Sequence, residues 1–194
     1  MNILVTSSTG FIGRYLVEWL VNNGYNVVSA GTSVEKAKIF PWFAKVKFTP
    51  CDYFAVGTDC HELFGRPDLL IHLAWKGLPN YMARFHIRRE SSHRDAAIAR
   101  EDAEFPMSGG EQLRDYQPVE KVAEYICRIA LSKEGGIANC CSGEMISVRR
   151  LVEEWVAASG SSIRLKTGVY GYPAYEGMAF WGDATRLRKV IGDA

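Results

Sequence analysis

The N-terminal residues constrain the fold of this 194-residue chain more strongly than any other stretch. Residues 2–6 are mainly apolar, as in a strand of a parallel sheet that is buried on both faces. They lead directly into a short turn at 7–13, and the next residues place Ile12, Leu16 and Leu20 on one helical stripe. A strand that turns this abruptly into a helix predicts the first βα unit of a parallel α/β sheet.

The rest of the first half continues this alternation. Further strands are predicted at 27–30, 46–48 and 69–74, with a short helix at 61–64. In a sheet with strand order 3-2-1-4, the apolar fourth strand lies at an exposed edge, and some other part of a chain has to cover it. The connection that follows is short for such a fold and invites exchange of segments between two copies. We therefore predict a homodimer, with segment swapping as one arrangement.

The pattern changes after the fourth strand. Residues 84–104 contain ten charged side chains in twenty-one positions and no convincing strand. The chain then returns to apolar periodicity, which predicts five further elements: a helix at 118–132, a strand at 137–141, a helix at 148–158 ended by Gly160, a strand at 162–166 and a last short helix begun by Asp183.

These patterns predict a truncated Rossmann-like parallel sheet with a small α/β C-terminal portion. The expected division is a dinucleotide-binding half at 1–86, a charged connector at 87–105 and a substrate-side portion at 106–194. The formal net charge is only +1, and the local arginines between 84 and 94 alternate with acidic residues, so we expect no nucleic-acid partner. No leader and no membrane-length apolar run is evident, which favours a cytoplasmic protein without a membrane partner.

The five cysteines form no CxxC pair and the four histidines are scattered, so no metal site is predicted. Buried free thiols in a reducing compartment are the favoured interpretation.

The turn at 7–13 has the chemistry of an anion site. A strand that turns sharply into a helix directs the free N–H groups and the positive end of the helix dipole at one point, which suits a diphosphate. Gly10 allows the backbone to approach the pyrophosphate, and Gly13 allows close packing of helix on strand.

Residues 5–13, Val-Thr-Ser-Ser-Thr-Gly-Phe-Ile-Gly, resemble the extended short-chain dehydrogenase/reductase family. Within it, they resemble the NAD-dependent epimerase/dehydratase branch, which acts on nucleotide sugars. The resemblance covers about residues 1–86 and 96–191 and extends to four further places: Asp52, His72-Leu-Ala-Trp75, Arg114-Asp-Tyr116 and Trp181-Gly-Asp183.

The resemblance implies roles for particular residues. In the family, the residue matching Asp52 contacts the adenine, Leu73-Ala74 lines the cofactor, and the residue matching Arg114 grips the diphosphate of the sugar nucleotide. The alternatives are that Asp52 only caps a turn and that Arg114 forms a surface ion pair with Asp115. The implied cofactor-binding set is Thr6, Ser7, Gly10, Phe11, Ile12, Gly13, Asp52, Leu73 and Ala74.

The chain departs from the family pattern in two places. Ser7 replaces the first glycine of the turn, where a Cβ atom strains the backbone or pushes the cofactor outward and weakens its binding. In addition, the catalytic Ser/Thr and the Tyr-x-x-x-Lys helix are missing between about Ile87 and Asp95, and none of the nine tyrosines has a lysine four residues later. The tyrosine and the lysine have to be four residues apart, because residues i and i+4 lie on the same face of a helix and can then act together in catalysis. No catalytic residue is therefore assigned.

The cofactor is NAD or NADP. Gly31-Thr32-Ser33 at the end of the second strand offers neither the acidic residue typical of NAD sites nor the arginine typical of NADP sites. Lys36 and Lys38 follow, and we interpret them as a solvated helix face.

The function predicted from these residues is that of an epimerase/dehydratase family protein that binds a dinucleotide or nucleotide sugar with little or no catalysis. Whether it is an enzyme stays open, although the family contains isomerases and oxidoreductases. The alternatives are a non-enzymatic self-associating or regulatory protein, and an internally deleted product without selected activity.

Overall fold

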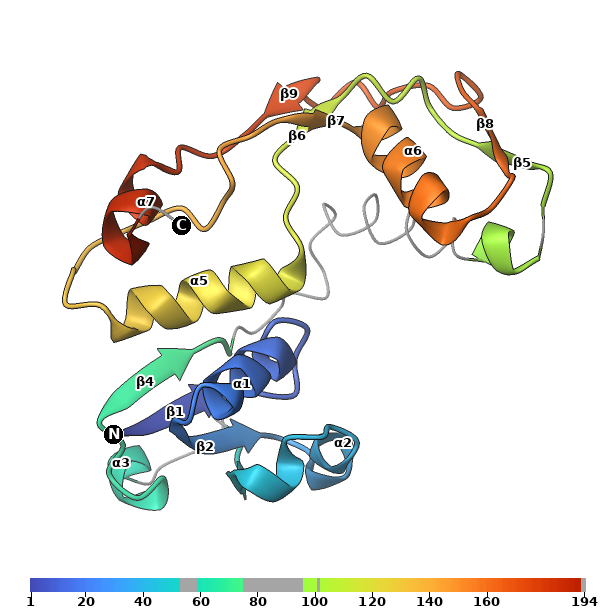
Figure 1. Ribbon diagram of the computed structural model, residues 1–194. Coiled ribbons are helices and arrows are strands. Elements are labelled where there is room, and N and C mark those ends of the chain that lie inside the picture. The colour runs from blue at the N-terminus through green and yellow to red at the C-terminus, as the bar shows by residue number, and fades with distance from the viewer. Residues whose placement is uncertain (53–58, 75–95, 101, 193–194) are drawn as a thin grey trace. The chain divides into compact units, whose positions relative to one another are not determined.

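The computed structural model describes residues 1–52, 59–74, 96–100 and 102–192 (Figure 1). The chain forms two compact units, and each is assembled from segments that are separate in the sequence. The first unit comprises Met1–Lys76, Gln117–Cys141 and Ala184–Ala194, and the second comprises Gly77–Tyr116 and Ser142–Asp183. The division predicted above, 1–86, 87–105 and 106–194, is contiguous, whereas these units interleave.

A four-stranded parallel sheet forms the centre of the first unit. Its strands are β1 (Asn2–Thr6), β2 (Asn26–Gly31), β3 (Lys47–Pro50) and β4 (Leu69–His72). The strand order is β3-β2-β1-β4, as the sequence predicts. In this register Leu4 of β1 lies between Val28 of β2 and Leu70 of β4. The carboxyl ends of β1 and β4 therefore lie side by side, which positions the residues that follow them.

Helices from both halves of the sequence complete the first unit. They are α1 (Gly13–Asn22), α2 (Val34–Lys38), α3 (Cys60–Leu63), α5 (Val119–Leu131) and α7 (Thr185–Ile191), with a 3-10 helix at Phe43–Lys45. The main core joins β1 to α1 and α5, and its central members are Ile3, Val5, Leu16, Leu20, Ala123 and Cys127. The apolar stripe of α5 thus packs on the N-terminal sheet unit, although about a hundred residues separate α5 from α1.

The second face of the sheet carries a smaller cluster. Leu4 and Ala30 pack there with Phe64, which ends α3. Side chains of β1 therefore enter cores on both sides, because successive residues of a strand point to opposite faces. Leu70 of β4 is 53% exposed and β4 pairs with β1 alone among the described strands. The apolar edge expected from the sequence is present, and what covers it stays a prediction.

The second unit contains two small sheets and one long helix. β5 (Glu104–Pro106) pairs with β8 (Arg164–Lys166), and β6 (Leu113–Arg114) lies between β7 (Ile146–Ser147) and β9 (Ala179–Phe180). Helix α6 (Val148–Ser159) packs Val152 on the core side chains of Phe105 and Ile163. It ends at Gly160, whose φ of 67° is the left-handed conformation expected of a glycine C-cap.

Two sequence predictions need correction. Residues 137–141 do not form a strand, because no strand of the described part of the chain pairs with them and an extended segment is stable only in a ladder. The last helix begins at Thr185 with Ala184 as its N-cap residue, so Asp183 does not begin it. Across the described ranges, the helices are too short or too polar to span a bilayer.

Candidate functional site

The turn between β1 and α1 is held by its own backbone and by β2. The Gly10 N–H donates to the carbonyl oxygen of Ser7 at 2.9 Å, and the Arg14 N–H donates to that of Gly10 at 3.3 Å. Ser8 is fully buried, and both its N–H (3.1 Å) and its hydroxyl (3.0 Å) donate to the carbonyl oxygen of Ala30. These hydrogen bonds therefore fix the turn to the neighbouring strand.

Glycine is required at both of the predicted glycine positions. A Cβ atom at Gly13 would collide with the carbonyl oxygen of Ser7 and lie 2.9 Å from the Cα atom of Ser8. At Gly10 it would lie 2.9 Å from the same Ser7 oxygen. The sequence predicted close approach at both places, and the structure gives its cause: the path of the backbone through Ser7.

Ser7 has a φ of 52°, in the left-handed region that favours glycine. An L-residue in this region costs on the order of 1–2 kcal/mol. The backbone strain predicted for Ser7 is therefore present, whereas its effect on a cofactor stays a prediction.

Thr6 and Leu73 meet at the carboxyl ends of β1 and β4. The Leu73 N–H donates to the hydroxyl oxygen of Thr6 at 3.0 Å, and the same hydroxyl lies 3.0 Å from Nδ1 of His72. Leu73 and Ala74 are half-buried. In open parallel sheets this edge is where ligands bind, so the structure brings these predicted residues to the expected place.

The remaining predicted cofactor residues differ in exposure. Phe11 is 56% exposed at the tip of the turn, and Ile12 is the half-buried N-cap residue of α1. Asp52 follows β3 and is exposed. All three side chains are therefore at least partly exposed to solvent.

The region after β2 supports the interpretation of Lys36 and Lys38 as a helix face. The Ser33 hydroxyl caps α2 by accepting the Lys36 N–H at 3.2 Å. Lys38 forms an ion pair with Glu35 at 2.7 Å, and both lysines are exposed. Ser33 and Lys38 are therefore already engaged within the helix.

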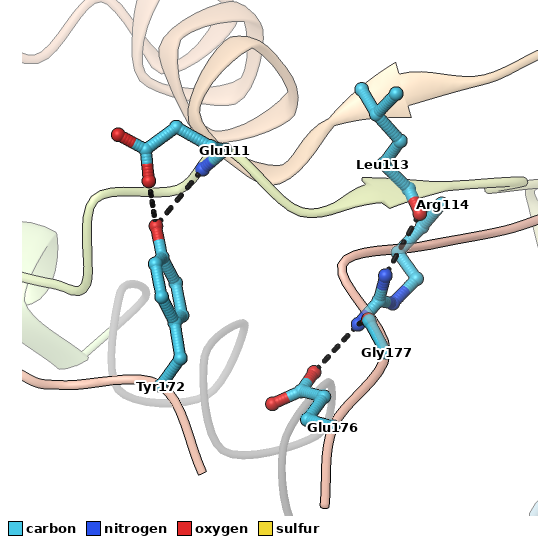
Figure 2. Close-up of polar contacts among 6 residues, drawn as sticks. All are labelled: Glu111, Leu113, Arg114, Tyr172, Glu176 and Gly177. Atoms are coloured by element: carbon cyan, nitrogen blue, oxygen red, sulfur yellow. Dashed lines mark hydrogen bonds and ion pairs between the residues drawn. The ribbon is translucent and has the colours of Figure 1, made fainter. Parts of the chain in front are cut away.

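Arg114, the predicted diphosphate ligand, lies on β6 in the second unit (Figure 2). Its Nη2 group donates to the carboxylate of Glu176 at 2.7 Å and to the Gly177 carbonyl at 2.9 Å, and Nη1 donates to the Leu113 carbonyl at 2.8 Å. The guanidinium also lies 5.3 Å from the ring centroid of Phe180, within cation–π range. The side chain of Arg114 is only 13% exposed.

Asp115 is not the ion-pair partner of Arg114, contrary to the alternative considered from the sequence. Its carboxylate accepts the Ser142 N–H at 2.9 Å, the Ser142 hydroxyl at 2.6 Å and the Gly143 N–H at 2.8 Å. Desolvation by burial acts to raise the pKa of Asp115, but hydrogen bonds from Ser142, Gly143 and Gly182 outweigh it and lower the pKa. Asp115 follows β6 and is held by Ser142 and Gly143 instead.

A second contact joins the loop before β9 to the segment before β6. The Tyr172 hydroxyl donates to the Glu111 carboxylate and accepts the Glu111 N–H at 3.2 Å (Figure 2). Sequence reasoning assigned no role to Glu111 or Glu176. One signal was available, since Glu176 is the only acidic residue between 167 and 182.

Potential metal ligands and two thiols shielded by burial lie in the part of the chain that the structure describes. It contains no group of three or more potential metal ligands. Burial raises the pKa of Cys127 to about 12 and that of Cys140 to about 11, so both thiols are protonated near neutral pH.

Known proteins resemble this chain in sequence and in fold. The model of the NAD-dependent epimerase/dehydratase family matches residues 3–86, which include β1, the turn and β4. A curated relative is dTDP-6-deoxy-L-talose 4-dehydrogenase (NAD(+)) of Aggregatibacter actinomycetemcomitans. It is 23% identical over 270 aligned positions that take in 94% of this chain and 99% of the relative.

Solved structures share the fold. A protein of Burkholderia cenocepacia J2315, provisionally described as an epimerase, superposes with a TM-score of 0.75 at 17% identity, covering 99% of this chain and 92% of the other. A UDP-N-acetylglucosamine 4-epimerase of Methanobrevibacter ruminantium M1, in complex with UDP-N-acetylmuramic acid, gives a TM-score of 0.69 at 15% identity, with 97% and 91% covered.

Proposed function

Because this chain belongs to the NAD-dependent epimerase/dehydratase family, we propose that it binds a dinucleotide at the β1–α1 turn and a nucleotide sugar beside Arg114, with little or no turnover. The observation that carries the proposal is the turn itself. Gly10 and Gly13 leave no Cβ atom at two crowded positions of this turn, which supports close approach of a phosphate to its backbone.

The loss of catalysis is proposed from the sequence. A dehydrogenase or epimerase of this family needs an acid/base group at the reacting sugar carbon. No tyrosine of this chain is followed by lysine at the fourth position. The alignment with the talose dehydrogenase is 270 positions long, against 194 residues here, which favours an internal deletion. Its expected place, between about Ile87 and Asp95, lies outside the described residues.

The cofactor proposed is NAD or NADP, bound more weakly than in relatives with glycine at position 7. The relative's name specifies NAD(+), which favours NAD. In our proposal the turn N–H groups hold the pyrophosphate, Asp52 contacts the adenine, and Leu73 and Ala74 line the cofactor. The bound cofactor would supply hydride exchange, and this chain's own residues would only hold and orient it.

A second candidate function is a non-enzymatic, self-associating protein. The observation that favours it is β4, whose Leu70 is 53% exposed at the sheet edge. A second copy that covers this edge would give the proposed homodimer, with or without exchanged segments. Light scattering should then report the mass of two chains at micromolar concentration, and the mass of one chain would rule the dimer out.

Calorimetric titration with NAD, NADP, UDP-glucose and dTDP-glucose tests the main proposal. We expect heat with at least one dinucleotide and one nucleotide sugar. In the Gly10→Ala variant the new Cβ atom lies 2.9 Å from the Ser7 oxygen, on a turn that must approach a phosphate closely, so dinucleotide binding should fall at least about tenfold. Gly135→Ala is the matched control, because a Cβ atom there meets nothing within 4 Å.

Different results would select among the hypotheses. Absence of heat with all four ligands would reject the binding proposal and leave the self-associating or internally deleted protein. Measurable oxidation or epimerisation of a nucleotide sugar would reject the proposed loss of catalysis.

A further inference from the structure

Arg114 already holds an anion that belongs to the chain. We infer that Glu176 occupies the position of the ligand's diphosphate at Arg114, so that a nucleoside diphosphate has to displace this carboxylate in order to bind. This inference rests on the proposed nucleotide-sugar binding at Arg114 and adds a competing group that sets the affinity of that site.

The geometry of the guanidinium supports direct competition. Of its five N–H groups, those used for Leu113, Glu176 and Gly177 lie on the two Nη atoms (Figure 2). Oxygen pairs of carboxylates and phosphates both recognise the planar fork of arginine. A diphosphate that uses the Nη2 edge therefore needs the position that the Glu176 oxygen fills.

Charge makes the competition stronger. The side chains of Arg114 and Glu176 are 13% and 22% exposed, so solvent screens their interaction only partly. With Glu176 in place, the pair carries no net charge and a dianionic ligand gains little long-range attraction. With Glu176 withdrawn, the same ligand meets an uncompensated cation.

The loop that carries Glu176 can release it locally. On one side Tyr172 is fixed to Glu111, and on the other the Leu113 N–H donates to the Met178 carbonyl at 2.8 Å. Between these two attachments, Glu176 is held by a turn in which its N–H donates to the Pro173 carbonyl at 3.0 Å. Residues 173–177 therefore form a short segment between two attachments, and a ligand that replaces Glu176 and Gly177 at Arg114 would release it while both of its ends stay attached.

Titration of the full-length chain with dTDP tests the inference. Glu176→Gln keeps the shape of the side chain and removes its charge, and we expect dTDP to bind about tenfold more tightly, the scale of one charge-assisted hydrogen bond. The matched control is Glu154→Gln, which removes the same charge from an exposed ion pair with Arg150 in the same unit and should change the affinity less than about twofold. Arg114→Gln should abolish binding in both backgrounds.

Hydrogen exchange of the wild-type chain gives a second measurement that needs no variant to fold. Saturating dTDP should speed exchange of the amides at 174–177 if Glu176 is displaced. Unchanged or weaker dTDP binding by Glu176→Gln, or slower exchange at 174–177, would overturn the competition while leaving nucleotide binding intact. Absence of dTDP binding by the wild type and by Glu176→Gln alike would remove the proposed site and this inference together.

Discussion

The two candidate binding regions are prepared for an anion in opposite ways. The β1–α1 turn is shaped by backbone hydrogen bonds and by glycines. Among the described residues, no acidic side chain caps α1, and the first turn of α1 contains no acidic residue. The Arg114 region is shaped by side-chain charges, and its cation is already paired with Glu176. We call the β1–α1 turn the backbone-made region, and Arg114 with the adjacent Asp115 the charge-made region. Anion binding in the first depends on the absence of Cβ atoms, whereas in the second it depends on which anion pairs with the arginine.

The largest expected effect concerns the backbone-made region. Gly13→Ala would place a Cβ atom against the Ser7 carbonyl and 2.9 Å from the Ser8 Cα atom, both of which are backbone atoms in a turn fixed to β2. Because neither can move cheaply, we expect the free energy of unfolding to fall by about 3 kcal/mol. Urea unfolding followed by circular dichroism measures it.

Gly171→Ala serves as the control for Gly13→Ala, because a Cβ atom at Gly171 meets nothing within 4 Å. It should change the free energy of unfolding by less than about 0.5 kcal/mol. A Gly13→Ala variant as stable as this control would mean that the turn is soft, and the contrast between the two regions would disappear.

The next effect belongs to the charge-made region. Hydrogen bonds lower the pKa of Asp115 despite its burial, so its ionised form stabilises the folded chain. Asp115→Asn should cost on the order of 1.5–3 kcal/mol near neutral pH, the usual loss for hydrogen bonds to a charged group. A group with a lowered folded pKa contributes stability above its unfolded pKa and loses it as the pH falls through the folded pKa.

The pH dependence makes the Asp115 prediction specific. The stability difference between wild type and Asp115→Asn should be constant near neutral pH and shrink below about pH 4, where the unfolded carboxyl begins to titrate. Unfolding curves at several pH values would show this. A difference that does not change down to pH 2 would show that the carboxylate charge contributes nothing and that only shape matters.

The sequence predicted the backbone-made region well, because its signals are local. Short, mainly apolar runs defined the strands, Gly10 and Gly13 marked the turn, and the order β3-β2-β1-β4 followed from the βαβ pattern. The strain at Ser7 could be predicted for the same reason, since a serine stands at one position whose backbone conformation favours glycine.

The charge-made region was harder to predict because its partners are distant in the sequence. Glu176 lies 62 residues beyond Arg114, and Ser142 lies 27 residues beyond Asp115. The apolar stripe of α5 indicated burial but not its partner α1, so the interleaving of the two units was missed. The strand predicted at 137–141 failed similarly, because strand formation depends on a neighbour that composition does not reveal.

The smallest expected effect concerns Ser7, and it tests whether the backbone strain at this residue weakens cofactor binding in the backbone-made region. Ser7→Gly removes the Cβ atom from a residue with φ of 52°. The relieved strain of about 1–2 kcal/mol is partly offset by the greater freedom of glycine in the unfolded chain, about 0.5–1 kcal/mol. We expect a net gain of about 0.5 kcal/mol in the free energy of unfolding, together with tighter NAD binding by calorimetry.

Arg66→Gly is the matched control for Ser7→Gly, because Arg66 has a nearly identical φ of 54° on the connection between α3 and β4, outside the turn. It should gain stability to a similar degree, less the small contribution of its exposed ion pair with Glu62, and leave NAD affinity unchanged. If both variants gain stability and neither binds NAD more tightly, the strain at Ser7 lowers the stability of the fold without affecting NAD binding. In that case the serine does not weaken the cofactor site, and the backbone-made region is limited by something other than its first turn residue.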